Sequence, residues 1–108
     1  MKLVEFFDSE FLSQEFLCQD ETFVVHFLLW NNKPAKIVFD GVVGFCVFSN
    51  NALAGLMYEV SPSKFFHDAL SSLYETIPEQ HAYKCYDIID VDDIPFIKVV
   101  ARGYKFFK

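Results

Sequence analysis

The stretch Thr22-Phe-Val-Val-His-Phe-Leu-Leu-Trp30 is followed by Asn31-Asn-Lys-Pro34 and by a second apolar run, Lys36-Ile-Val-Phe39. Both runs are rich in β-branched and aromatic residues, which is typical of strands. The Asn-Asn-Lys-Pro segment between them is a strong turn signal. We therefore predict a β-hairpin over 22–39 and an antiparallel sheet built outward from it.

Other segments on both sides of this hairpin have strand composition and are separated by turn residues. They are 2–7, 42–48, 82–90 and 94–101. Residues 52–60 are compatible with either a helix or a strand. The basic and aromatic segment 102–108 is expected to be a final strand whose Lys and Arg side chains protect an exposed sheet edge.

One segment carries a clear helix signal. Ser61 is a plausible N-cap, Pro62 suits the first helical position, and Pro78 stops the helix. Residues 9–18 also have apolar side chains at helical spacing, which favours a short helix there. The predicted fold class is α+β: an antiparallel sheet of five or six strands with one main amphipathic helix, with or without the short second one.

Length and composition fit one domain over 1–108. The chain has 108 residues, of which 53% are hydrophobic and 22% charged. A chain of this size buries a core without help from metals or disulfides. We find no internal repeat and no linker-like tract.

The charge balance restricts the class of partner. Nine Lys and Arg stand against 15 Asp and Glu, for a net charge of −6. This balance opposes binding to nucleic acid or to an anionic membrane and favours a basic protein. Glu5 and Asp8 interrupt the start of the chain, so we do not expect a signal peptide there, and no apolar run is long enough to span a bilayer. We expect a cytoplasmic protein.

The candidate site is Tyr86-Asp-Ile-Ile-Asp-Val-Asp-Asp-Ile-Pro-Phe96, which holds four carboxylates in seven residues. Such a segment suits a surface that attracts a cationic partner. An EF-hand starting at the second of these acids would need Gly and Glu where Pro95 and Ala101 stand. A magnesium-dependent nuclease site would need a further acid or Lys nearby. We expect neither metal nor cofactor. The candidate partner-binding residues are Asp87, Asp90, Asp92 and Asp93, with Tyr86 as an aromatic anchor and Asp20 and Glu21 as a second patch.

No motif for catalysis accompanies these acids. His26, His67 and His81 lack the spacing of a helical metal pair, and the three cysteines contain no CxxC pair. A Cys–His nucleophile pair formed by the fold stays open as an alternative. The glycines build no phosphate loop. We therefore expect a protein that is not an enzyme.

The layout of the chain resembles the small acidic immunity proteins of bacterial toxin–immunity systems, including those of contact-dependent growth inhibition. The residues behind this resemblance are the hairpin Trp30–Phe39 and the segment Tyr86–Phe96. It implies a cytoplasmic protein that neutralises a basic toxin by capping its cationic surface. The kind of toxin that it favours is a nuclease. Two other functions stay open: a small-molecule-binding or enzymatic α+β domain with an aromatic-lined pocket, and an oligomerising domain that pairs sheet edges.

Overall fold

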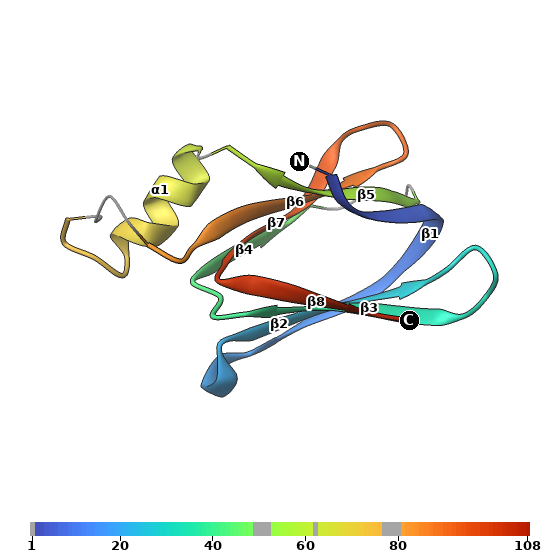
Figure 1. Ribbon diagram of the computed structural model, residues 1–108, viewed down its shortest axis with the longest axis horizontal. Coiled ribbons are helices and arrows are strands. Elements are labelled where there is room, and N and C mark those ends of the chain that lie inside the picture. The colour runs from blue at the N-terminus through green and yellow to red at the C-terminus, as the bar shows by residue number, and fades with distance from the viewer. Residues whose placement is uncertain (1, 49–52, 62, 77–80) are drawn as a thin grey trace.

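The computed structural model describes residues 2–48, 53–61, 63–76 and 81–108. The elements within these ranges are β1 (Lys2–Leu17), η1 (Cys18–Asp20), β2 (Thr22–Leu28), β3 (Pro34–Asp40), β4 (Gly44–Val47), β5 (Ala54–Val60), α1 (Lys64–Ser71), β6 (Lys84–Asp90), β7 (Pro95–Ala101) and β8 (Gly103–Phe107). The strands form one antiparallel sheet in the order β4-β7-β6-β5-β1-β2-β3-β8 (Figure 1).

The predicted α+β class is wrong, because the described part of the chain is mostly strand and contains one α-helix of eight residues. The sheet has eight strands rather than five or six. The short helix expected over 9–18 is also wrong. These residues continue β1, and only the 3-10 turn η1 follows them.

A β-bulge explains why this part of β1 has apolar residues at helical spacing. Phe11 lies opposite Phe27, Phe16 lies opposite Phe23, and the register shifts just after Phe11. Phe23 and Phe27 are four residues apart in a regular strand, so their side chains share a face. The extra residue at the bulge therefore brings Phe11 and Phe16 to one face in spite of their odd separation along the chain.

The sheet folds into two layers because β1 is shared between them. Its first half pairs with β5 in the layer β4-β7-β6-β5, and its second half pairs with β2 in the layer β2-β3-β8. The register of β1 against β5 shifts between Glu5 and Ser9, and Asp8 in this interval has a positive φ of 59°. The buried Ser9 hydroxyl donates a hydrogen bond to the Phe6 carbonyl. The corner of β1 is therefore stabilised by its own backbone and side chains.

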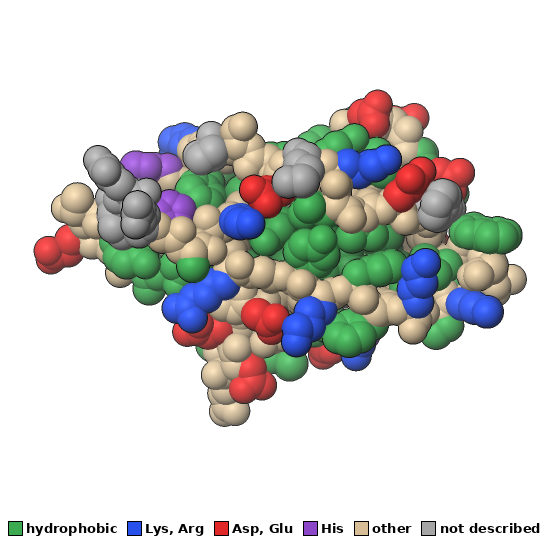
Figure 2. All heavy atoms as spheres, viewed as in Figure 1, with side chains coloured by type: hydrophobic (Ala, Val, Ile, Leu, Met, Phe, Trp, Pro, Cys, Tyr) green, Lys and Arg blue, Asp and Glu red, His purple; other side chains and the backbone are tan. Residues whose placement is uncertain are grey.

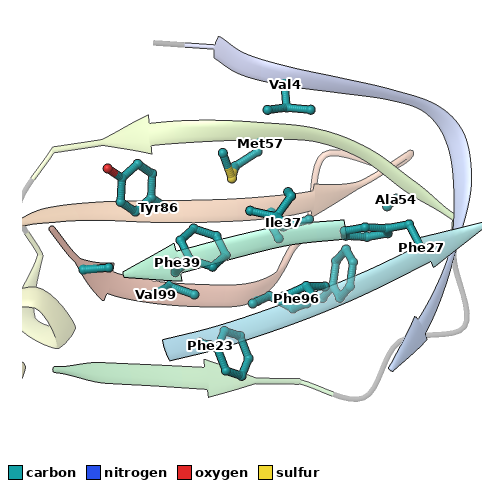
Figure 3. Close-up of a cluster of buried hydrophobic side chains, with 14 of the residues drawn as sticks. Val4, Phe23, Phe27, Ile37, Phe39, Ala54, Met57, Tyr86, Phe96 and Val99 are labelled. Carbon is teal, nitrogen blue, oxygen red and sulfur yellow. The ribbon is translucent and has the colours of Figure 1, made fainter. Parts of the chain in front are cut away.

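Large apolar side chains from both layers fill the space between them (Figure 3). Aromatic rings predominate: the centroids of Phe6 and Phe27 are 4.5 Å apart, and Phe11 packs edge-on against Phe96. The core members with no exposed surface are Phe6, Phe23, Val25, Phe27, Ile37, Phe39, Ala54, Met57, Ile88, Ile97, Val99 and Ala101. This core explains the high aromatic content of the chain.

Helix α1 packs on one outer face, where Phe66 and Leu70 join Cys85 and Val100 in a second apolar cluster. Gly44 on β4 allows the close approach, since a Cβ there would lie 3.0 Å from the Cβ of Ala69.

The N-cap of α1 is Ser63 and not the predicted Ser61. Ser63 Oγ accepts a hydrogen bond from the backbone N–H of Phe66 at 3.4 Å. The helix ends at Ser71. Pro62 and Pro78, which the sequence assigns to its start and its end, lie outside the described residues.

The hairpin predicted over 22–39 is confirmed, with Phe23 opposite Phe39 and Phe27 opposite Ala35. Strands are also confirmed at 82–90 and 94–101, as β6 and β7, and at 42–48, as the shorter β4. The segment 52–60, compatible in sequence with helix or strand, contains β5. The final segment forms β8, an edge strand that pairs only with β3 among the described strands.

Candidate functional site

The turn between β6 and β7 holds the acidic segment in a fixed shape. Asp90 Oδ1 accepts hydrogen bonds from the backbone N–H groups of Asp92 and Ile94, at 2.8 and 3.0 Å. The Asp90 N–H donates to the Ile94 carbonyl, and Asp93 turns the chain with a φ of 64°. Asp90 is only 4% exposed. Its carboxylate therefore shapes the turn, while the acids Asp92 and Asp93 are exposed to solvent.

Acids from β1 meet this turn at an acidic cleft of about 190 Å³. Its lining consists of Glu5, Asp8, Gly55, Leu56, Asp90, Val91 and Asp93. Gly55 lets β5 come close, because a Cβ at this position would lie 3.1 Å from the Asp90 carbonyl oxygen. Glu5 and Asp8 are not among the predicted site residues. They are far from the turn in sequence, and only the pairing of β1 within the same layer brings them close to it.

Two aliphatic side chains stand among these acids. Ile94 is 58% exposed and Val91 is also exposed. Interfaces commonly surround a few apolar side chains with charged ones, because the apolar group gains from leaving water while the charges select the partner. The end of the molecule that carries the β6–β7 turn therefore offers both kinds of contact.

Tyr86 is not part of this surface. It is 3% exposed and lies between the two layers, where its ring contacts Phe39 and Tyr104 (Figure 3). Burial, with smaller effects from Glu59 and Tyr104, raises the pKa of Tyr86 to about 12. The aromatic side chain predicted as an anchor therefore belongs to the core.

Asp87 is buried too, on the opposite face of β6. It lies across from Lys98, whose Nζ is 3.0 Å from Asp87 Oδ2. Its other oxygen, Oδ1, is buried and accepts no hydrogen bond from the described residues. A buried carboxylate is stabilised by its ion pair and is costly to leave unpaired. The Asp87 carboxylate is therefore occupied by Lys98, and it does not line the acidic cleft.

Asp20 and Glu21 lie at the turn η1, which is at the lower edge of the view in Figure 1, whereas the β6–β7 turn is at the upper edge. Both are exposed. Glu21 has a φ of 51°, and its carbonyl accepts a hydrogen bond from the N–H of Val42 at 2.8 Å. The two predicted patches are thus separate surfaces.

Figure 2 shows how charge is distributed on one face. Acidic side chains lie over the β6–β7 turn and basic side chains lie near the β2–β3 turn, while charged side chains of both signs are intermixed over other parts of the face. Apolar side chains occupy the middle of the face. Glu5 is shared by two clefts, since it lines the acidic cleft and also a second cleft beside the β2–β3 turn.

No match was found when the chain was compared with protein-family models, with curated proteins and with solved structures. Function is therefore inferred from the geometry. Among the residues that the structure describes, no three His, Cys, Asp or Glu side chains are arranged to hold a metal ion. No helix in the same part of the chain is long and apolar enough to cross a membrane.

The surroundings of the Cys85 thiol and of two imidazoles are defined by their contacts. Burial, reinforced by Asp87, raises the pKa of the Cys85 thiol to about 11, which keeps it protonated at neutral pH. A protonated thiol is a poor nucleophile. His26 Nε2 lies 3.5 Å from a Glu15 oxygen, and His81 Nδ1 accepts a hydrogen bond from the Tyr83 N–H. These contacts give the imidazoles surface and structural roles.

Proposed function

We propose that this chain is a non-enzymatic binding protein that binds a cationic protein at the acidic cleft and the neighbouring β6–β7 turn. The observation that carries the proposal is the convergence of Glu5 and Asp8 from β1 with Asp93 from the β6–β7 turn around one cleft. Side chains of Asp8, Asp92 and Asp93 form no ion pair with the described residues, so they are available to cations of a partner.

The turn is suited to binding because it is ordered before a partner arrives. The hydrogen bonds of Asp90 hold the backbone of Asp92 and Ile94, so little conformational entropy remains to be lost there. Exposed carboxylates accelerate association with a basic protein, and the exposed Ile94 supplies apolar contact once the proteins meet.

We favour a basic toxin domain as the partner, and a nuclease as the kind of toxin. A nuclease must bind phosphate, so its active cleft is cationic. An acidic protein that covers such a cleft blocks the substrate and associates quickly. This agrees with the resemblance to immunity proteins of toxin–immunity systems. On this proposal the chain acts in the cytoplasm, where the toxin would reach its target.

The test first identifies a candidate partner by sequencing the neighbouring coding region for an exported protein with a basic C-terminal domain. It then measures the affinity between the purified chain and that domain by interferometry at low and high salt. We expect the double variant D92N/D93N to weaken binding about tenfold at low salt and to reduce the salt dependence. Asn is chosen because it tolerates the positive φ of Asp93.

The matched control is D20N/E21Q, which removes the same charge from the turn η1 at the opposite edge of the view in Figure 1. At about 0.1 M salt it is expected to change the affinity less than about twofold, because a Debye length of roughly 10 Å screens charges that are distant from the interface. Thermal unfolding of each variant verifies the fold. Equal loss of affinity in both double variants, or no binding of the toxin domain by the unaltered chain, contradicts the proposal.

A further inference from the structure

A second cleft lies beside the β2–β3 turn and has a different chemistry. Its volume is about 450 Å³, which is within the range of small-molecule sites. The residues that line it are Glu5, Leu29, Trp30, Asn31, Lys33, Phe106 and Lys108. They come from β1, the β2–β3 turn and the C-terminal strand region, so the cleft is formed by the fold and not by one loop.

The turn that carries Trp30 is held in place by its own backbone. The Leu29 N–H donates to the Lys33 carbonyl at 2.8 Å, and the Asn32 N–H donates to the Leu29 carbonyl at 2.8 Å. Asn31 Oδ1 accepts a hydrogen bond from the Lys33 N–H, and Asn32 has a φ of 62°. Trp30 is nevertheless 70% exposed. A large indole held in water by an ordered turn is available for contact with an occupant of the cleft.

A second ring lies in the same cleft. Phe106 of β8 is half-buried and packs edge-on against Phe6 of the core, with ring centroids 6.1 Å apart. This contact with the core fixes one apolar surface of the cleft, while Trp30 supplies another from the turn. Two aromatic surfaces favour a flat ring as the occupant.

The charge of the lining distinguishes this cleft from the rest of the molecule. Lys33 and Lys108 form no ion pair within the described part of the chain, whereas Glu5 lies 3.7 Å from Lys2. In a chain with a net charge of −6, two ammonium groups at one cleft that pair with no described carboxylate favour an anionic ligand, while the Glu5 carboxylate of the same lining lies near Lys2.

We propose that this cleft binds a small aromatic carboxylate. The ring contacts Trp30 and Phe106, and the carboxylate interacts with Lys33 and Lys108. This site is separate from the acidic surface of the proposed function, and neither proposal depends on the other.

The test uses 2-naphthoate as the probe, with its neutral amide and its methylammonium analogue as matched controls of the same ring. Trp30 is the only tryptophan, so its indole N–H gives one assigned NMR signal. We expect 2-naphthoate to shift this signal saturably and to bind about fivefold more tightly than the amide, and the cation to bind more weakly than the amide.

Two double variants assign the charge preference. K33Q/K108Q is expected to remove the preference for the carboxylate over the amide. The control K36Q/K105Q removes the same charge from β3 and β8 but leaves the lining intact, and the preference is expected to remain.

A further variant tests the aromatic contact. W30A, followed by calorimetry, is expected to lose binding of both the carboxylate and the amide. Equal affinities for the three probes, or equal effects of the two double variants, would overturn the proposal. D92N/D93N is expected to leave 2-naphthoate binding unchanged, which keeps this outcome separate from that of the proposed function.

Discussion

At the scale of single residues, one aspartate determines the shape of the acidic turn. The sequence predicts Asp90 as part of a binding surface together with its neighbours, but its Oδ1 accepts two backbone hydrogen bonds and its side chain is buried. Asp92 and Asp93, further along the same turn, are exposed. Acids that are equivalent in the sequence thus divide into one that holds the turn and two that face solvent.

This division can be tested by stability measurements. D90A leaves two backbone N–H groups without their acceptor, so we expect it to lower the free energy of unfolding by about 1–3 kcal/mol. D90N keeps an oxygen at the same position and is expected to cost less. The control D92A is expected to change stability by less than about 0.5 kcal/mol. Urea denaturation measures all three, and a D90A effect no larger than that of D92A would contradict the assignment.

Tyr86 gives a prediction for alkaline pH. Its pKa is raised from 10.0 to about 12 in the folded chain, so the folded state keeps the phenol proton longer than the unfolded state does. The contribution of Tyr86 to the free energy of unfolding is therefore fully present below pH 10 and is lost as the pH rises toward 12. Over this window the unaltered chain is expected to lose roughly 2 kcal/mol relative to Y86F, which has no proton to lose. Urea denaturation at several pH values tests this, and a pH-independent difference would contradict it.

At the scale of elements, the helix shows how local signals compete. The sequence Ser61-Pro62-Ser63-Lys64 contains two serines, and capping rules favour the first because Pro62 suits a first helical position. In the structure the helix begins at Lys64 and Ser63 is the N-cap. Both serines are acceptable caps, so the packing of the helix against β6 and β7 is what decides between them.

The two serines form a matched pair of variants. S63A removes the side-chain acceptor for the Phe66 N–H and is expected to lower stability by about 0.5–1 kcal/mol, at the modest end because this bond is 3.4 Å long. S61A is expected to have little effect. Thermal and urea unfolding distinguish them, and a larger loss in S61A would restore the cap that the sequence predicts.

The strands differ in how well the sequence predicts them. The 22–39 hairpin and the strands β6 and β7 are predictable because each depends on local composition and on a nearby turn. The course of β1 is not predictable, since its bulge after Phe11 changes which side chains share a face. Without knowledge of the bulge, the spacing of Phe11, Leu12 and Phe16 resembles that of a helix.

At the scale of the whole molecule, both proposed sites are assembled from distant segments. Asp92 and Asp93 can be found from the sequence because they are adjacent, whereas Glu5 and Asp8 reach the cleft only through pairing of β1 with β5. In the second cleft, the β2–β3 turn and Phe106 meet only because β8 returns beside β3. The number and sequence positions of the charged residues do not predict that the residues of either cleft lie close together.

The long strand β1 has a consequence for how this protein comes apart. Because its two halves belong to different layers, and because the inner faces of those layers share one set of rings, neither layer keeps a complete core if the other is lost. We therefore expect the two layers to unfold together and not in sequence. The acidic cleft lies beside the corner of that strand, so the proposed partner, bound there, would stabilise the segment that joins the two layers.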